Sequence, residues 1–181
     1  MAVRRTAIFL PMNAYRTFTR WYAQLLSWIL VASIAILIIP VSMQIFSRTI
    51  PLIPAYIWTE EMARFMFVWS IMIGAMIGVR EGTHFEVDVW PDMGPRKTAA
   101  LKFVSGLFIM VFALVFLWWG WEFTWEARNR ISELAELPLW MIHLAWPLAG
   151  FTWTVFQVEH LYDNLRAILG KPSGKPSEDR Q

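Results

Sequence analysis

The residues in this sequence best suited to chemistry are two acids and an arginine at the start of an apolar segment. Glu60 and Glu61 precede Arg64 by four and three residues, so on a helix both carboxylates can reach the guanidinium. The chemistry that this spacing allows is ion pairing and hydrogen bonding. Two interpretations follow: the group anchors a helix end as an interfacial ion pair, or it also contacts a partner subunit or a bound lipid.

A membrane-spanning helix must position this cluster. The run over residues 58–79 has 22 residues, and the 15 between Arg64 and Arg80 carry no charge. At 1.5 Å per residue, about 20 residues cross the hydrocarbon core of a bilayer. Thr59 is a suitable N-cap, while Arg80 and Gly82 suit the C-terminal end of the helix. The sequence therefore predicts that the cluster lies at one water interface.

Small residues follow one face of the same helix. Ser70, Gly74, Gly78 and Gly82 recur every four residues, and such a stripe lets another helix approach closely. Because glycine is common in membrane helices, the stripe predicts tight packing without identifying the helix that packs there.

Composition extends the membrane prediction to the whole chain. Of the 181 residues, 57% are hydrophobic and 17% are charged, against about a quarter charged in soluble domains. The sequence predicts an all-α integral membrane protein with four transmembrane helices and a short interfacial segment between the second and third. The expected spans are about 21–47, 58–79, 103–121 and 137–158.

Three regions follow from this division. We expect residues 1–20 to form a basic cytoplasmic or interfacial segment and residues 21–165 to form the four-helix transmembrane domain. Residues 166–181 are expected to form a polar, disordered cytoplasmic tail. Residues 122–136 are charged and predicted to be helical.

Basic residues are distributed unequally between the two sides of the predicted spans. Twelve of the 16 lysines and arginines fall in the N-terminal segment, the loop over residues 80–102 and the tail. Three fall on the opposite side, and Arg64 lies within the second span. The positive-inside rule then places both termini in the cytoplasm, with Glu60 and Glu61 facing out and His84 facing in.

Several classes of function lack the residues they need. The sequence contains no cysteine, which excludes disulfide, thiol-redox and cysteine–metal chemistry. A bis-histidine haem needs two buried imidazoles, whereas His84 and His160 fall outside the spans and His143 lies near the opposite face. The spans also lack the paired carboxylates of a complete secondary transporter. We expect no enzyme activity, no catalytic, substrate-binding or metal site, no cofactor and no nucleic-acid partner.

The segment that begins at Trp58 also resembles a known family. Residues 58–64 read WTEEMAR, Trp69 and Gly74 follow, and residues 80–87 read REGTHFEV. This pattern is similar to the signature of the small integral-membrane subunit of TRAP transporters, the DctQ family. The Leu-Pro-Leu-Trp run at 137–140, with Pro147 and Gly150 after it, is similar to the last helix of that family. The resemblance covers about residues 20–165.

The resemblance implies a tripartite system in the bacterial inner membrane that imports an organic acid. A periplasmic solute-binding protein (DctP-like) captures the acid, and a large permease subunit (DctM-like) carries it in with sodium. The small subunit is a multi-pass scaffold beside the large one, in contact with membrane lipids. The residues expected in the subunit interface or its structural motif are Trp58, Glu60, Glu61, Arg64, Trp69, Gly74, Gly78, Arg80, Gly82 and His84.

Two alternatives remain beside this interpretation. One is the small subunit of a different tripartite carboxylate transporter. The other is a self-contained four-helix membrane protein, either a channel or a redox carrier. A channel would need polar residues repeated along one helix face, and none of the four predicted spans has them.

Overall fold

The computed structural model describes residues 9–50, 56, 58–81 and 94–169 of this chain. Within these ranges the regular secondary structure is helical, apart from an isolated β-bridge between Ile131 and Pro138. The helices are α1 (Phe9–Thr49), α2 (Trp58–Glu81), α3 (Gly94–Glu126), the 3₁₀ turn η1 (Ala127–Asn129), α4 (Trp140–His143) and α5 (Ala145–Ile168).

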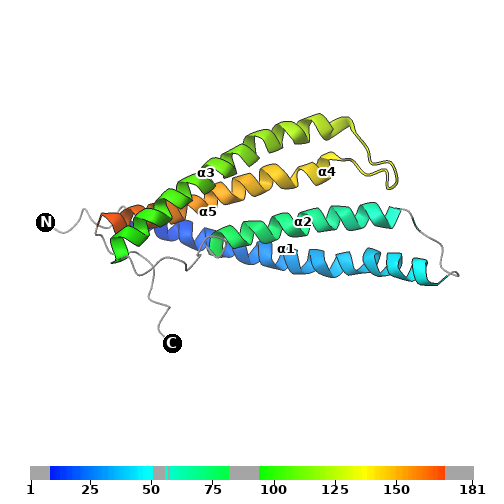
Figure 1. Ribbon diagram of the computed structural model, residues 1–181, viewed down its shortest axis with the longest axis horizontal. Helices are drawn as coiled ribbons and strands as arrows, with labels where there is room; N and C mark the ends of the chain where they lie inside the picture. The colour runs from blue at the N-terminus through cyan, green and yellow to red at the C-terminus, as the bar shows by residue number, and fades with distance from the viewer. Residues whose placement is uncertain (1–8, 51–55, 57, 82–93, 170–181) are drawn as a thin grey trace.

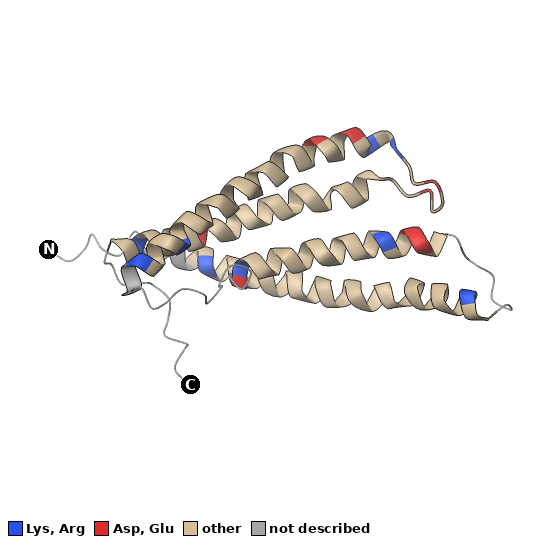
Figure 2. Ribbon diagram, viewed as in Figure 1, with Lys and Arg blue, Asp and Glu red and all other residues tan. Residues whose placement is uncertain are grey.

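Three helices are long and apolar enough to cross a membrane. They cover Ala14–Thr49, Trp58–Glu81 and Lys97–Asn129. Lysines, arginines, aspartates and glutamates gather at the two ends of the molecule and leave the middle of the helices uncharged (Figure 2). The predicted all-helical membrane protein is confirmed. The fourth span stays a prediction, and the interfacial segment expected between the second and third spans lies outside the described residues.

The helices form two hairpins that meet mainly where α2 packs on α5. α1 packs along α2, α3 packs along α5, and α2 packs against α5 (Figure 1). Within the described residues, α3 contacts neither α1 nor α2. The hairpins lie together at the end where α2 finishes, the Arg80 end, and diverge toward the end where α2 begins, the Glu61 end (Figure 1).

The tightest packing joins α3 to α5. A Cβ atom added at Gly150 would lie 2.4 Å from the backbone nitrogen of Leu117 and 2.7 Å from the carbonyl oxygen of Ala113. Backbone atoms have no room to move aside, so only glycine permits this approach. The buried apolar core combines residues of α1, α2, α3 and α5, and it includes Met76, Ala113, Trp153 and Phe156.

The sequence prediction of a helix over residues 122–136 is wrong in its second half. α3 ends at Glu126 and η1 at Asn129, and an irregular loop follows. In this loop the N–H of Ser132 bonds to Leu137 O at 2.8 Å, and Glu136 has a positive φ of 53°. We call residues 130–139 the hairpin loop.

The region of the predicted fourth span, 137–158, contains two helices, one of which extends beyond it. Helix begins only at Trp140, is interrupted at Leu144, and continues to Ile168. The interruption has a local cause, because Pro147 lacks the N–H that would bond to the carbonyl of His143. The break in the helix therefore lies about one turn before Pro147.

Candidate functional site

Glu61 ties the first turn of α2 to the hairpin loop. Its carboxylate accepts hydrogen bonds from the hydroxyl of Ser132, from the N–H of Ala135 at 2.7 Å and from the N–H of Leu134 at 3.3 Å. The residue is buried, with 9% of its surface exposed. The two N–H groups belong to a loop and form no helical hydrogen bond. The Glu61 carboxylate is therefore their acceptor.

Glu60 and Arg64 form a separate, exposed pair. Arg64 Nη2 lies 3.5 Å from Glu60 Oε1, and the two side chains are 65% and 62% exposed. The sequence had grouped both acids with Arg64, but the structure turns Glu61 to the hairpin loop and leaves Glu60 as the arginine's salt-bridge partner. An exposed pair of this kind contributes about 1 kcal/mol or less to stability.

Two tryptophans of the predicted motif lie on α2, Trp58 in its first turn and Trp69 near its middle. The Trp69 indole nitrogen donates to the carbonyl of Met141 at 3.1 Å, which joins α2 to α4. Trp58 is 44% exposed and faces the Tyr56 ring at 6.4 Å. Trp69 is thus a further contact between the hairpins, near the middle of α2, while Trp58 is exposed.

The small-residue stripe on α2 is only partly used by the chain itself. The Ser70 hydroxyl lies 2.9 Å from that of Ser33 on α1, and Gly78 is buried. Around Gly74, in contrast, a Cβ atom would meet nothing within 4 Å. Gly82 and His84, the last two predicted motif residues, lie outside the described residues.

Arg80 connects three helices at the opposite end. Its guanidinium donates to the backbone carbonyl of Thr19 on α1 and lies 5.7 Å from the ring centre of Phe156 on α5. The carbonyl of Arg80 in turn lies 3.0 Å from His160 Nε2. The sequence predicted only a favourable charge at a helix C-terminus, whereas the structure gives Arg80 a part in holding the hairpins together.

Sequence reasoning missed a buried ion pair beside Arg80. Arg16 on α1 pairs with Asp163 on α5 and lies 3.6 Å from Glu159, and the Thr19 hydroxyl donates to Glu159 at 2.9 Å. The Arg16 and Asp163 side chains are only 9% and 13% exposed. The available signal was the spacing of Glu159 and Asp163, which places two acids on one face of a helix end.

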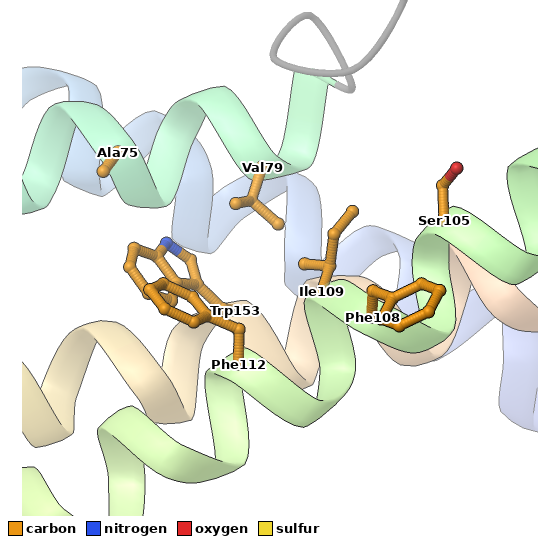
Figure 3. Close-up of a pocket in the computed structure, with 7 residues that line it drawn as sticks. All are labelled: Ala75, Val79, Ser105, Phe108, Ile109, Phe112 and Trp153. Carbon is orange, nitrogen blue, oxygen red and sulfur yellow. The ribbon is translucent and has the colours of Figure 1, made fainter.

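An apolar groove opens between the hairpins, nearer to the Arg80 end. Its volume is about 630 Å³, and α5 forms its floor between walls from α2 and α3 (Figure 3). Ser105 is the one hydroxyl residue among otherwise apolar and aromatic lining residues. Within the described part of the chain, no group of three acids or histidines is placed to hold a metal ion. The lining residues are Ala75, Val79, Ser105, Phe108, Ile109, Phe112 and Trp153.

Comparison with known proteins gives one consistent result. The family model for the DctQ component of tripartite ATP-independent periplasmic transporters matches residues 37–167. A sialic acid TRAP transporter small permease protein of Vibrio cholerae is 27% identical over 128 residues, which cover 69% of this chain and 73% of that protein. A putative TRAP transporter small permease protein of Haemophilus influenzae is 23% identical and covers 61% and 70%. A C4-dicarboxylate TRAP transporter small permease protein of Rhodobacter capsulatus is 29% identical, over 52% of this chain but 43% of the relative.

Proposed function

Because this chain belongs to the DctQ family and is the small permease subunit of a tripartite periplasmic transporter, we propose that it acts as the fixed scaffold of that transporter. In this role it packs beside a large permease subunit in the bacterial inner membrane. The large subunit carries the substrate and couples its import to sodium. The small subunit binds neither substrate nor cofactor.

The observation that carries this proposal is the position of the charges. α1 between Arg20 and Arg48, α2 between Arg64 and Arg80, and α3 between Lys102 and Glu122 contain no lysine, arginine, aspartate, glutamate or histidine, and the charges lie at the two ends (Figure 2). A transport pathway for an organic anion and a cation needs polar or charged groups near mid-membrane. Large apolar side chains, in contrast, are exposed along much of α1 and α3, as expected for a subunit embedded in lipid and protein.

The substrate class follows from the relatives rather than from this chain. The names of the relatives specify sialic acid and C4-dicarboxylates, both of which carry carboxylate groups. We therefore propose that the complete system imports an organic acid delivered by a periplasmic binding protein. The Glu61 end, with its exposed Glu60–Arg64 pair, is the outer surface available to that protein.

Transport in proteoliposomes tests the scaffold role. Vesicles containing the large subunit, this chain and the binding protein should take up the organic acid when a sodium gradient is applied. Vesicles containing this chain with the binding protein alone should show no uptake. Sodium-driven uptake by the purified small subunit would overturn the proposal.

Orientation has a separate test. We propose that α4 and α5 together form a fourth span and that both termini are cytoplasmic. Reporter domains fused after Gln181 should be active only as cytoplasmic reporters, and those inserted within residues 49–57 only as periplasmic ones. A periplasmic C-terminus would contradict the twelve-to-three distribution of basic residues on which the orientation rests.

A further inference from the structure

Arg20 lies on α1 at the Arg80 end and has no oppositely charged partner among the described residues. It is exposed, and it directly precedes the uncharged stretch over residues 21–47 that enters the membrane. None of the ion pairs and hydrogen bonds of the described residues includes it. Arg20 is therefore a charged side chain at the level where the hydrocarbon core begins, open to whatever surrounds the protein there.

Two other arginines lie close to Arg20. Arg16 precedes it by one turn of α1, and Arg80 donates to the carbonyl of Thr19, the residue next to Arg20. Arg20 and Arg80 are close enough for their charges to repel each other. An anion bound at Arg20 would relieve this repulsion.

The acids of this region are already next to the other arginines. Asp163 and Glu159 pair with Arg16, and Glu81 follows Arg80 in the chain and attracts its charge. Residues 1–20 contain four arginines and no acid. The described chain thus offers no counter-ion to the exposed arginine of α1.

The surroundings of Arg20 favour a phospholipid over a free anion. Trp21, Leu25 and Trp28 are exposed and follow one face of α1 from the level of Arg20 into the membrane. Tryptophan is typical of the boundary between lipid headgroups and hydrocarbon. A phosphate bound at Arg20 would therefore have an apolar surface beside it for the acyl chains of the same lipid.

We propose that Arg20, with the charge of Arg80 behind it, binds the headgroup phosphate of an acidic phospholipid such as phosphatidylglycerol. The site goes beyond the scaffold function, because it lies on the small subunit alone. The proposed orientation decides only the leaflet in which the lipid lies. It places the lipid in the cytoplasmic leaflet, whose surface is negatively charged.

Thermal unfolding of the full-length chain in mixed micelles tests the site. Detergent micelles contain increasing amounts of phosphatidylglycerol or phosphatidylcholine, and the rise of the unfolding temperature with added lipid gives the affinity. We expect Arg20→Gln to bind phosphatidylglycerol about fivefold more weakly than the unmodified protein, which corresponds to about 1 kcal/mol for one basic residue at an acidic surface.

Arg48→Gln is the matched control. Arg48 is exposed at the other end of the same helix, and the first turn of α2 at that end carries Glu60 and Glu61. This variant should bind phosphatidylglycerol as the unmodified protein does. Arg20→Lys, which keeps the positive charge, should retain most of the affinity.

The contrary outcomes are specific. Equal affinity of Arg20→Gln and the unmodified protein, or equal losses in Arg20→Gln and Arg48→Gln, would overturn the proposal. Equal stabilisation by phosphatidylcholine, which has no net charge, or by inorganic phosphate, which has no acyl chains, would overturn it as well. Micelles have no leaflets, so an incorrect orientation would leave these results unchanged. A failure of the scaffold function would be seen separately, in the uptake assay.

Discussion

The carboxylate of Glu61 accepts a hydrogen bond of 2.7 Å from the backbone N–H of Ala135, so the first turn of one hairpin holds the loop of the other. The hairpins diverge at this end (Figure 1), and here the contact is polar rather than a packed apolar core. The Glu61 carboxylate therefore adds hydrogen bonds from α2 to a loop that is also closed by its own backbone bond from Ser132 to Leu137.

Glu61→Gln should loosen the hairpin loop. The glutamine amide keeps one acceptor oxygen but loses the negative charge that strengthens the three hydrogen bonds. Its NH₂ group would also lie against loop groups that are themselves hydrogen-bond donors. We expect faster hydrogen exchange at Leu134 and Ala135 and faster proteolysis within residues 130–139. Glu60→Gln, at the neighbouring exposed acid, serves as the matched control and should change neither. Identical exchange in the two variants would show that Glu61 does not hold the loop.

Gly150→Ala and Gly74→Ala should have opposite effects on the stability of the protein in detergent. At Gly150 the added methyl would lie 2.4 Å from a backbone atom of α3, so the hairpin must open, at about 1–3 kcal/mol. At Gly74 the methyl meets nothing within 4 Å, and the gain in helix propensity is worth up to about 1 kcal/mol. Thermal unfolding of the two variants measures the difference, and a stable Gly150→Ala protein would contradict the close α3–α5 contact.

The sequence predicts the helices that depend on local properties and misses what depends on distant contacts. The uncharged runs in α1, α2 and α3 are long enough to identify a membrane helix, and the structure contains all three. The hairpin loop was predicted as helix because its charges are helically spaced. In the structure, its backbone N–H groups bond to Glu61, which lies more than seventy residues earlier in the chain. No local pattern contains that information.

The candidate residues show the same division. Glu60 and Arg64 pair as their spacing predicts, because four residues on a helix bring side chains together. The partners of Arg80 could not be predicted, since they come from α1 and α5. Arg16 and Asp163, 147 residues apart in the chain, were missed for the same reason.

Asp163→Asn should destabilise the joined hairpins at the Arg80 end. Arg16 and Asp163 are largely buried, and removing one member of a buried ion pair typically costs about 3–5 kcal/mol. Thermal unfolding should show the loss, together with faster exchange in the first turns of α1. The double variant Arg16→Leu/Asp163→Leu removes both members of the pair but leaves Glu159 without Arg16, so it should recover only part of the stability. A neutral effect of Asp163→Asn would mean that Glu159 alone suffices for Arg16.

Arg64→Glu tests whether the exposed pair at the Glu61 end contacts a partner. Both side chains are more than 60% exposed, so the reversal should change the stability of the isolated subunit by about 1 kcal/mol or less. In the assembled transporter we expect weaker co-purification with the large subunit, because a negatively charged partner group that attracts Arg64 would be repelled by the glutamate.

The swap Glu60→Arg/Arg64→Glu distinguishes the two interpretations of this pair. It restores an ion pair within the helix but reverses its direction relative to any partner, so it should rescue assembly only in part. Full rescue would indicate that the pair acts only within α2. Assembly and uptake in Arg64→Glu equal to those of the unmodified protein would show that the pair is a solvated helix end, and the outer contact surface would then lie elsewhere.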